Sequence, residues 1–146
     1  MADLALIRVD SRLIHGQVVT RWVKQLGAKR VYIVDDELKN DPFLTSVFKM
    51  ATPQGTTLEI ASCEEAGAAF QKDKLGEGIV FVLFKSITSA KKAHDAGFHF
   101  ESLQVAGLGA GPNKKVVYRT VSLDVTDAEN LVALSKACLL YTSRCV

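Results

Sequence analysis

Short apolar runs recur along the 146-residue chain and alternate with longer stretches whose apolar residues follow a helical period. The runs RVYIVD (30–35) and GIVFVLF (78–84) show almost no polar alternation. Such runs are typical of strands that are buried on both faces of a parallel sheet. The pattern predicts six strands, at 4–9, 30–35, 56–61, 78–84, 102–107 and 115–123.

Helical stretches separate these predicted strands. Over 16–27, Val19, Trp22 and Val23 fall on one face, and Gly27 marks the end of the helix. Residues that favour helix N-termini precede the later stretches. They are Asp41 with Pro42, Ser62 with Glu65 at the capping-box position, Ser86 or Thr88, and Thr126. This alternation predicts an α/β fold with an open, mostly parallel doubly wound sheet and helices on both faces.

The length fits a single domain that spans residues 1–146. No stretch rich in proline, glycine and serine divides the chain, and no internal repeat is visible. The segment ACLLYTSRCV (137–146) follows neither the helical nor the strand period. We therefore expect an atypical or truncated C-terminal segment there.

Composition narrows the class of protein. Hydrophobic residues make up 48% and charged residues 23% of the chain, which is ordinary for a globular domain with a core. The net charge of +2 is too small to indicate a nucleic-acid partner. Three cysteines without a CxxC pair indicate neither a disulfide framework nor a zinc site. No apolar stretch is long enough to span a membrane, so we expect a soluble cytoplasmic protein.

Polar residues cluster in the loop that follows the first predicted strand. Ligands of doubly wound folds bind at the carboxyl ends of strands, and a helix N-terminus favours an anion. Arg12 supplies a planar guanidinium that suits phosphate oxygens. Asp10 would accept a hydrogen bond from one imidazole nitrogen of His15 and leave the other as a nucleophile. On these grounds alone, a catalytic His15 and an ordinary surface histidine are equally open.

Other candidate sites carry weaker signals. The glycine-rich stretch 107–113 lacks the spacing of a dinucleotide fingerprint, and either a plain turn or a loop that touches a partner or phosphate is open. The acidic residues at 35–37 favour a solvated turn over a magnesium site. His94 and His99 favour structural or solvated roles, because no third ligand has metal-binding spacing. Neither a Walker loop nor a nucleophile elbow is present, so we expect neither a P-loop nucleotide site nor a Ser/His/Asp triad, and no other motif indicates a cofactor.

The run RVDSRLIHGQVVTRW (8–22) resembles the mannose/fructose/sorbose-type enzyme IIB component of the bacterial phosphoenolpyruvate-dependent sugar phosphotransferase system. Further agreement lies in VYIVDDELKNDPF (31–43), ATPQG (51–55), FVLFKS (81–86) and VAGLGAGPNKK (105–115). The resemblance covers about residues 4–136. The RLIHGQ run is the specific part, and the later segments support it.

This resemblance implies a protein-histidine phosphotransferase that acts on sugars. It implies that His15 accepts a phosphoryl group from a phosphohistidine of enzyme IIA and passes it to a sugar held by the membrane components IIC and IID. Arg12 matches the arginine that neutralises the phosphoryl oxygens, and Arg8 and Asp10 match the flanking loop. The implied location is the cytoplasm, peripherally at the membrane permease, with no metal and no nucleotide.

The chain departs from the family pattern at two places. Ser11 stands where an acidic residue is frequent, and 137–146 does not resemble the usual final strand and proline-containing tail. Two other classes of function stay open beside the phosphocarrier. One is a non-enzymatic module of the same fold that binds a small anion, and the other is a flavodoxin-like binder of a nucleotide or flavin, which rests on fold analogy alone.

Overall fold

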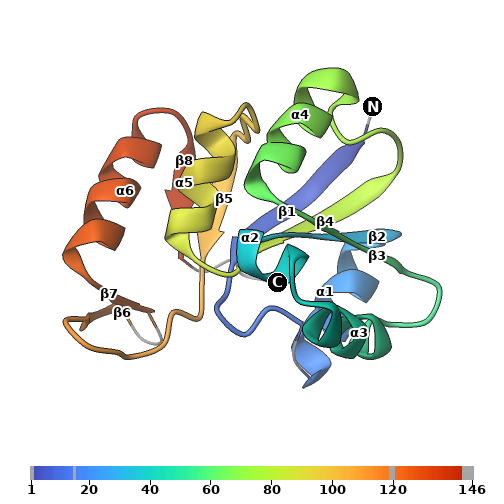
Figure 1. Ribbon diagram of the computed structural model, residues 1–146, viewed down its shortest axis with the longest axis horizontal. Coiled ribbons are helices and arrows are strands. Elements are labelled where there is room, and N and C mark those ends of the chain that lie inside the picture. The colour runs from blue at the N-terminus through green and yellow to red at the C-terminus, as the bar shows by residue number, and fades with distance from the viewer. Residues whose placement is uncertain (1, 15, 119–120, 143–146) are drawn as a thin grey trace.

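A computed structural model describes residues 2–14, 16–118 and 121–142, in which strands and helices alternate through most of the chain (Figure 1). The strands of the main sheet are β1 (Asp3–Val9), β2 (Arg30–Val34), β3 (Thr57–Ala61), β4 (Ile79–Phe84), β5 (Ser102–Val105) and β8 (Leu139–Tyr141). Two further strands are β6 (Lys115–Tyr118) and β7 (Val121–Leu123). The helices are α1 (Gly16–Leu26), α2 (Asp36–Lys39), α3 (Pro42–Ala51), α4 (Cys63–Asp73), α5 (Ile87–Asp95) and α6 (Val125–Ser135).

The main sheet has six strands in the order β3-β2-β4-β1-β5-β8. Every neighbouring pair is parallel, so all carboxyl ends lie along one edge of the sheet. The central strands β4 and β2 are almost entirely buried, as their continuous apolar runs predict. The predicted open α/β fold is therefore confirmed.

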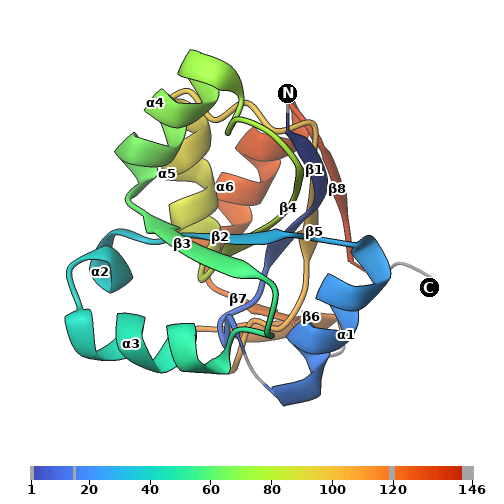
Figure 2. The ribbon, with the colours of Figure 1, turned by 90° about the vertical axis from the view of Figure 1, so that its right-hand side faces the viewer.

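Each face of the sheet is covered by its own helices. Figure 2 shows α4, α5 and α6 together on one side of the sheet and α1 on the other. On the α1 side, Val19 and Val23 pack with strand residues such as Ile33 and Phe81. On the opposite side, small helix residues such as Ala90 pack against the strands. The further residues of that second core include Ala66, Val82, Phe84, Ala93, Phe98 and Leu134.

The helices that follow the neighbouring strands β1 and β4 cover opposite faces of the sheet. The helix after β1 is α1, and the helix after β4 is α5, which belong to the two different cores. Such a point is where doubly wound folds open a crevice at the carboxyl ends of their strands. The topology therefore singles out the loop between β1 and α1.

The helix starts follow the predicted capping residues with one exception. Asp41, Ser62 and Ser86 each accept a hydrogen bond from the backbone of the first turn, and Ser62 forms the predicted capping box with Glu65. The prediction that Thr126 caps the last helix was wrong. The N-cap is Asp124, because its carboxylate reaches the backbone N–H three residues on and completes a reciprocal capping box.

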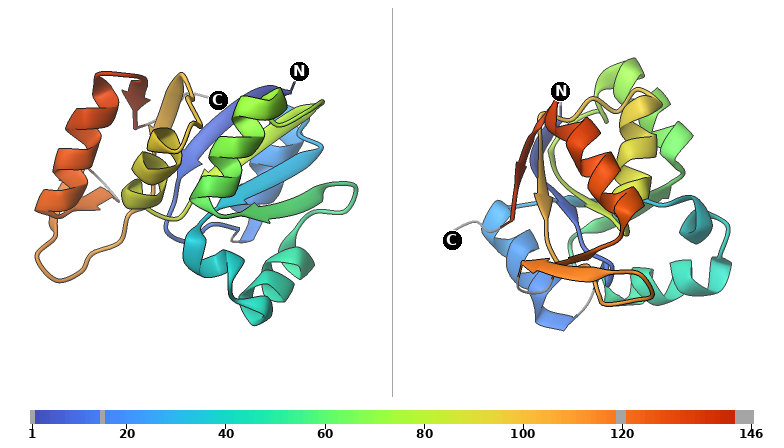
Figure 3. Two further views of the ribbon diagram at one scale, coloured as in Figure 1. Left: turned by 45° about the horizontal axis from the view of Figure 1, so that its top comes forward. Right: turned by 90° about the vertical axis from the view of Figure 1, so that its left-hand side faces the viewer.

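The prediction of one strand over 115–123 was also wrong. The segment forms the antiparallel hairpin of β6 and β7, separate from the main sheet. Figure 3 (right) shows this hairpin lying across the carboxyl ends of the sheet strands. It is attached there through Leu108, whose carbonyl accepts a 2.8 Å hydrogen bond from the backbone of Ser122.

Part of the C-terminal segment forms a short edge strand. Residues 139–141 are β8, which pairs in parallel with β5 in the register Ser102 to Leu139 through Gln104 to Tyr141. The side chain of Leu140 packs against the core on the α4–α6 side, and Tyr141 packs against the core on the α1 side. This segment therefore covers the outer edge of β5.

Candidate functional site

Backbone hydrogen bonds attach the loop after β1 to the two neighbouring strands. The N–H of Asp10 donates to the carbonyl of Phe84 at the end of β4, at 2.9 Å. The N–H of Ser11 donates to the carbonyl of Gly107 beyond β5, at 2.7 Å. The backbone of the loop is thereby fixed to both neighbouring segments, independently of any side-chain contact.

A tight turn follows these attachments. The N–H of Leu13 donates to the carbonyl of Asp10 at 3.0 Å, and the N–H of Arg12 donates to the Asp10 carboxylate at 3.1 Å. Leu13 has a positive φ of 54°, which residues other than glycine rarely adopt. Its side chain is only 2% exposed and packs in the α1-side core together with Ile14. Burial of these two side chains holds the strained turn in place.

Asp10 lies between two arginines. Its carboxylate is fully buried and accepts from Arg8 Nη2 at 3.1 Å through one oxygen and from Arg12 Nε at 3.4 Å through the other. A buried carboxylate is tolerated when it is paired and hydrogen-bonded in this way. The structure thus brings together the two predicted site residues Asp10 and Arg12. The buried carboxylate of Asp10 orients the guanidinium of Arg12.

Arg12 presents its charge at the surface. The side chain is 59% exposed, although its Nε is tied to Asp10. Among the described residues, its two terminal nitrogens have no hydrogen-bond partner. A planar guanidinium that is fixed at one end and open at the other suits an anion with several oxygens, such as a carboxylate or a phosphate.

Arg8 is held on the other side of the same carboxylate. Its Nη1 donates to Gln104 Oε1 at 2.7 Å, and its guanidinium lies 5.8 Å from the ring centroid of Trp22 in α1. Gln104 was not among the predicted site residues. The signal in the sequence is a glutamine inside the otherwise apolar run 103–106, and the structure buries that residue to 2% exposure.

Gly107 shows where the glycine-rich stretch contributes. A Cβ at this position would stand 3.0 Å from an Asp10 carboxylate oxygen and 3.3 Å from Arg12 Nη2. Only glycine leaves the room that these two side chains occupy. The beginning of the 107–113 stretch therefore packs against the loop, a contact within the chain that neither open reading of that stretch named.

His15, the predicted phosphoryl acceptor, lies outside the described residues. Its neighbours in sequence are Ile14, which is buried, and Gly16, at which α1 begins. The 11-residue helix α1 has no acidic residue in its first turn, so its N-terminus keeps the partial positive charge of the backbone. Arg12 and the start of α1 thus make this end of the loop electropositive.

A shallow cleft of about 300 Å³ opens beside the loop. Ser11 and Leu13 line it from the loop, Lys85 lines it from the end of β4, and residues of α2 and α3 close the far side. Lys85 is exposed. It adds a second cationic side chain to the carboxyl edge of the sheet.

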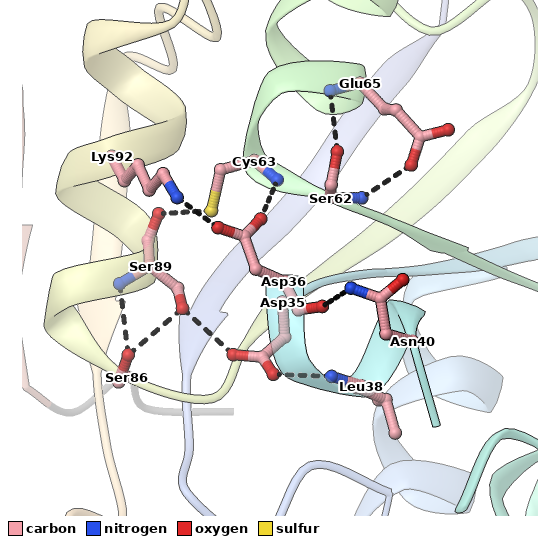
Figure 4. Close-up of polar contacts among 10 residues, drawn as sticks. All are labelled: Asp35, Asp36, Leu38, Asn40, Ser62, Cys63, Glu65, Ser86, Ser89 and Lys92. Atoms are coloured by element: carbon pink, nitrogen blue, oxygen red, sulfur yellow. Dashed lines mark hydrogen bonds and ion pairs between the residues drawn. The ribbon is translucent and has the colours of Figure 1, made fainter. Parts of the chain in front are cut away.

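Two of the acidic residues after β2, Asp35 and Asp36, form hydrogen bonds that join neighbouring helices. Asp35 is buried, caps α2 through the N–H of Leu38 at 3.0 Å, and accepts from the hydroxyl of Ser89 at 3.0 Å (Figure 4). These bonds join α2 to α5 and account for Asp35 without a metal. Among the described residues, no group of three or more histidine, cysteine, aspartate or glutamate side chains is arranged to hold a metal ion.

Asp36 joins three helices in the same region. It accepts from the N–H of Cys63 at 2.8 Å and forms an ion pair with Lys92 (Figure 4). The hydrogen bond from Lys92 and the backbone bond from Cys63 lower the pKa of Asp36. Burial, together with the nearby Asp36 carboxylate, raises the pKa of the Cys63 thiol to about 12. Cys63 therefore carries a neutral thiol.

The other two histidines lie at the opposite edge of the sheet. The rings of His94 and His99 are 5.2 Å apart, and His94 meets Phe100 edge-on at 5.1 Å. Burial lowers the pKa of His94. His99 lines a cavity of about 500 Å³ next to Asp3, at the start of β1, whereas the loop with Arg12 follows its end. Neither histidine is part of the site at the loop.

No helix within the described residues is both long and apolar enough to cross a membrane.

Comparisons with known proteins agree on one family. A family model described as "PTS system sorbose subfamily IIB component" matches residues 4–146. The sorbose-specific EIIB component of Klebsiella pneumoniae is 32% identical over 134 residues, which cover 92% of this chain and 82% of that protein. The mannose-specific EIIAB component of Escherichia coli K12 is 30% identical over 126 residues, which cover 86% of this chain and 39% of that protein.

Solved structures give the same result. The crystal structure of manxB from Thermoanaerobacter tengcongensis superposes with a TM-score of 0.87 at 32% identity and covers 98% of this chain and 87% of that chain. The IIBSor domain of the sorbose permease from Klebsiella pneumoniae superposes with a TM-score of 0.86 at 32% identity, with 94% and 85% coverage. The likeness therefore extends over nearly the whole fold.

Proposed function

Because this chain belongs to the sorbose-subfamily IIB components of the sugar phosphotransferase system, we propose that it is a phosphocarrier that uses His15 as its acceptor. It receives a phosphoryl group from enzyme IIA. It passes the group to a sugar during uptake through the membrane components IIC and IID. In this role it acts in the cytoplasm, bound peripherally to the permease.

The observation that carries this proposal is the arrangement of the loop between β1 and α1. Arg12 is tied to a buried carboxylate through its Nε while 59% of its side chain is exposed. The N-terminus of α1, at Gly16, follows four residues later and directly after His15 in sequence. A nucleophile between a fixed guanidinium and a helix N-terminus sits where negative charge is stabilised.

The chemistry requires only transfer between two nucleophiles. A lone pair on an imidazole nitrogen of His15 attacks the phosphorus of a phosphohistidine on enzyme IIA. The donor's P–N bond breaks as the new one forms, and its electron pair leaves with the donor imidazole. A sugar hydroxyl then attacks the phosphorus, the bond to His15 breaks, and the hydroxyl proton passes to the freed imidazole or to water. Arg12 stabilises the charge on the phosphoryl oxygens in both steps.

The proposed donor is supported by the composition of one relative. The Escherichia coli protein is named a mannose-specific EIIAB component, and this chain matches 39% of its length. A relative whose name joins A and B components favours direct transfer between the two. The sorbose, mannose and fructose names among the relatives support a sugar as the final acceptor.

Labelling from phosphoenolpyruvate tests the proposal. The purified chain is incubated with the general phosphotransferase components, enzyme IIA and labelled phosphoenolpyruvate. We expect a protein-bound phosphate that is stable in base and labile in acid. Peptide mapping should locate the label at His15.

Three single variants make this test specific, because the chain has three histidines. His15→Ala should accept no label, whereas His94→Gln and His99→Gln should be labelled like the parent chain. The side chains of His94 and His99 lie at the far edge of the sheet. The two controls therefore remove a histidine each without changing the loop. A His15→Ala variant that still carries base-stable label would rule the proposal out.

A further inference from the structure

We propose that Gln104 is a positioning residue for phosphoryl transfer, which acts on Arg12 through Arg8 and Asp10. This inference rests on the proposed function of the loop. Gln104 lies on β5, contacts neither Arg12 nor the loop backbone by any hydrogen bond among the described residues, and is 2% exposed. Its effect must therefore travel through Arg8.

The sheet register brings Gln104 and Arg8 together. The two residues are partners across the parallel pair of β1 and β5, so their side chains leave the same face of the sheet. The guanidinium has only donors, and therefore the amide oxygen of Gln104 must face it. The 2.7 Å distance from Arg8 Nη1 to Gln104 Oε1 is a short, charge-assisted hydrogen bond.

This bond decides how Arg8 approaches Asp10. With Nη1 engaged by Gln104, only Nη2 is directed at the carboxylate, and it uses the single oxygen Oδ2 at 3.1 Å. The second oxygen, Oδ1, is left to accept from the backbone and Nε of Arg12. The stacking of Arg8 beside Trp22 limits its other orientations.

Loss of the Gln104 acceptor would change this arrangement. An arginine with two unengaged terminal nitrogens prefers a bidentate pair with a carboxylate. Arg8 would then engage both oxygens of Asp10 and compete with Arg12 for Oδ1. Arg12 would keep its charge but lose its anchor, and a displaced donor stabilises a transferring group less well.

Gln104→Met tests this mechanism, because methionine matches the length of glutamine and lacks the acceptor. We expect the maximal rate of His15 labelling to fall about tenfold. The donor concentration at half-maximal rate should stay unchanged, since a buried side chain cannot touch enzyme IIA. Gln104→Glu keeps an acceptor oxygen and should restore most of the rate.

Leu103→Met is the matched control. Leu103 precedes Gln104 on β5 and is fully buried on the opposite face, in the α4–α6 core. This variant introduces the same side chain into the same strand, away from Arg8. We expect a small loss of thermal stability and an unchanged labelling rate. A rate that falls equally in both methionine variants would overturn the positioning role.

A double-substitution cycle tests the route through Arg8. In an Arg8→Met background, the Gln104→Met change should cause no further loss of rate, because the residue on which Gln104 acts is already gone. Independent, multiplying losses would contradict the proposed route. The parent chain and His15→Ala are run in the same assay, so failure of the parent chain to take label is recognised as failure of the proposed function.

A spectroscopic measurement tests the positioning without any transfer. The backbone N–H of Arg12 donates to Asp10 Oδ1, so its ¹H–¹⁵N signal reports whether that oxygen is available. We expect this signal to shift and exchange faster with solvent in Gln104→Met but not in Leu103→Met. An Arg12 signal that is the same in the parent chain and Gln104→Met would overturn the proposal even if labelling fails altogether.

Discussion

A single buried carboxylate connects the two arginines of the loop between β1 and α1. Asp10 divides its oxygens between Arg8 and Arg12, and the Arg12 side chain is 59% exposed whereas that of Arg8 is 13% exposed. A buried charge of this kind is costly unless both of its oxygens are engaged. Because the buried carboxylate of Asp10 has to be paired, it holds the exposed guanidinium of Arg12 in a fixed direction.

The exposed guanidinium leads to a first prediction. Arg12→Ala should change the free energy of unfolding by less than about 1 kcal/mol, because the Arg12 side chain is largely exposed, its 3.4 Å ion pair is long, and the backbone N–H at position 12 still donates to Asp10. Labelling of His15 should slow about 100-fold, since one charge-stabilising donor is removed from the transferring group. Arg12→Lys should recover part of the rate through charge alone. Initial labelling rates and urea unfolding measure both effects, and an unaltered rate would exclude Arg12 from the site.

Gly107 leads to a second prediction at the same scale. The Cβ of Gly107→Ala would press on Asp10 and Arg12, so we expect a loss of about 1 kcal/mol in the free energy of unfolding. The labelling rate should fall several-fold as Arg12 is displaced. Gly109→Ala is the control in the same stretch, because nothing lies within 4 Å of a Cβ there. Equal behaviour of the two alanine variants would contradict the close approach at Gly107.

Single residues show which parts of the site can be predicted from the sequence. Asp10 and Arg12 are close in sequence and share one loop, so residue type and position were enough to propose both as candidates, and the structure pairs their side chains. Gln104 stands 96 positions from Arg8, and only the strand order makes the two neighbours. A lone polar residue in an apolar strand indicates a buried partner, but it does not reveal which one.

At the scale of elements, the start of α6 offers a direct comparison between a predicted cap and an observed one. Asp124→Ala should cost about 1 kcal/mol of stability, because it removes the carboxylate that accepts from the backbone N–H of Asp127 in the first turn of α6. Thr126→Ala should change stability by less than about 0.5 kcal/mol, because Thr126 is exposed inside the helix. Urea unfolding measures both variants. A larger loss of stability in Thr126→Ala than in Asp124→Ala would instead support Thr126 as the cap.

The junction of α2, α4 and α5 gives a prediction about cysteine reactivity. Cys63 is buried and the pKa of its thiol is raised to about 12, so little nucleophilic thiolate exists near neutral pH. Iodoacetamide at pH 8 should therefore leave Cys63 unmodified in the folded chain and modify it in urea. Peptide mass mapping measures the difference. Equal rates in the two states would show that the junction is open.

The same thiol predicts how stability depends on alkaline pH. An unfolded cysteine has a pKa of about 8.5, so the folded value of about 12 is a raised one. Between these pH values the unfolded chain loses a proton that the folded chain keeps, and the free energy of unfolding falls as pH rises. Tyr32, whose pKa burial also raises to about 12, acts in the same direction above pH 10. Cys63→Ser should flatten the part of the decline that begins near pH 8.5.

Elements differ in how far local sequence determines them. The caps at Asp41, Ser62 and Ser86 were correctly predicted because a cap needs only residues within one helical turn. The hairpin of β6 and β7 was interpreted as one strand because residues that favour strands, such as Val116, Tyr118 and Val121, recur along the whole of 115–123. In the sequence, Arg119 and Thr120 separate the two strands, so neither glycine nor proline marks a reversal of the chain.

At the scale of the whole molecule, the strand order links the end of the chain to the loop near its beginning. From the outer edge inwards, β8 lies beside β5 and β5 beside β1. Tyr141 is the register partner of Gln104, which is in turn the partner of Arg8. The segment after residue 136 is far from the loop in sequence but only two strands away in the sheet.

This neighbourhood predicts the effect of ending the chain after Lys136. Without β8, strand β5 becomes the sheet edge and the core loses the side chains of Leu140 and Tyr141, which should lower stability by about 2–3 kcal/mol. Water would also reach Gln104, so the labelling rate should fall about as far as in Gln104→Met while His15 remains the labelled residue. Leu139→Ala, which trims an exposed side chain of the same strand, should leave stability and rate nearly unchanged. A shortened chain with full stability and full rate would show that β8 contributes to neither the fold nor the loop.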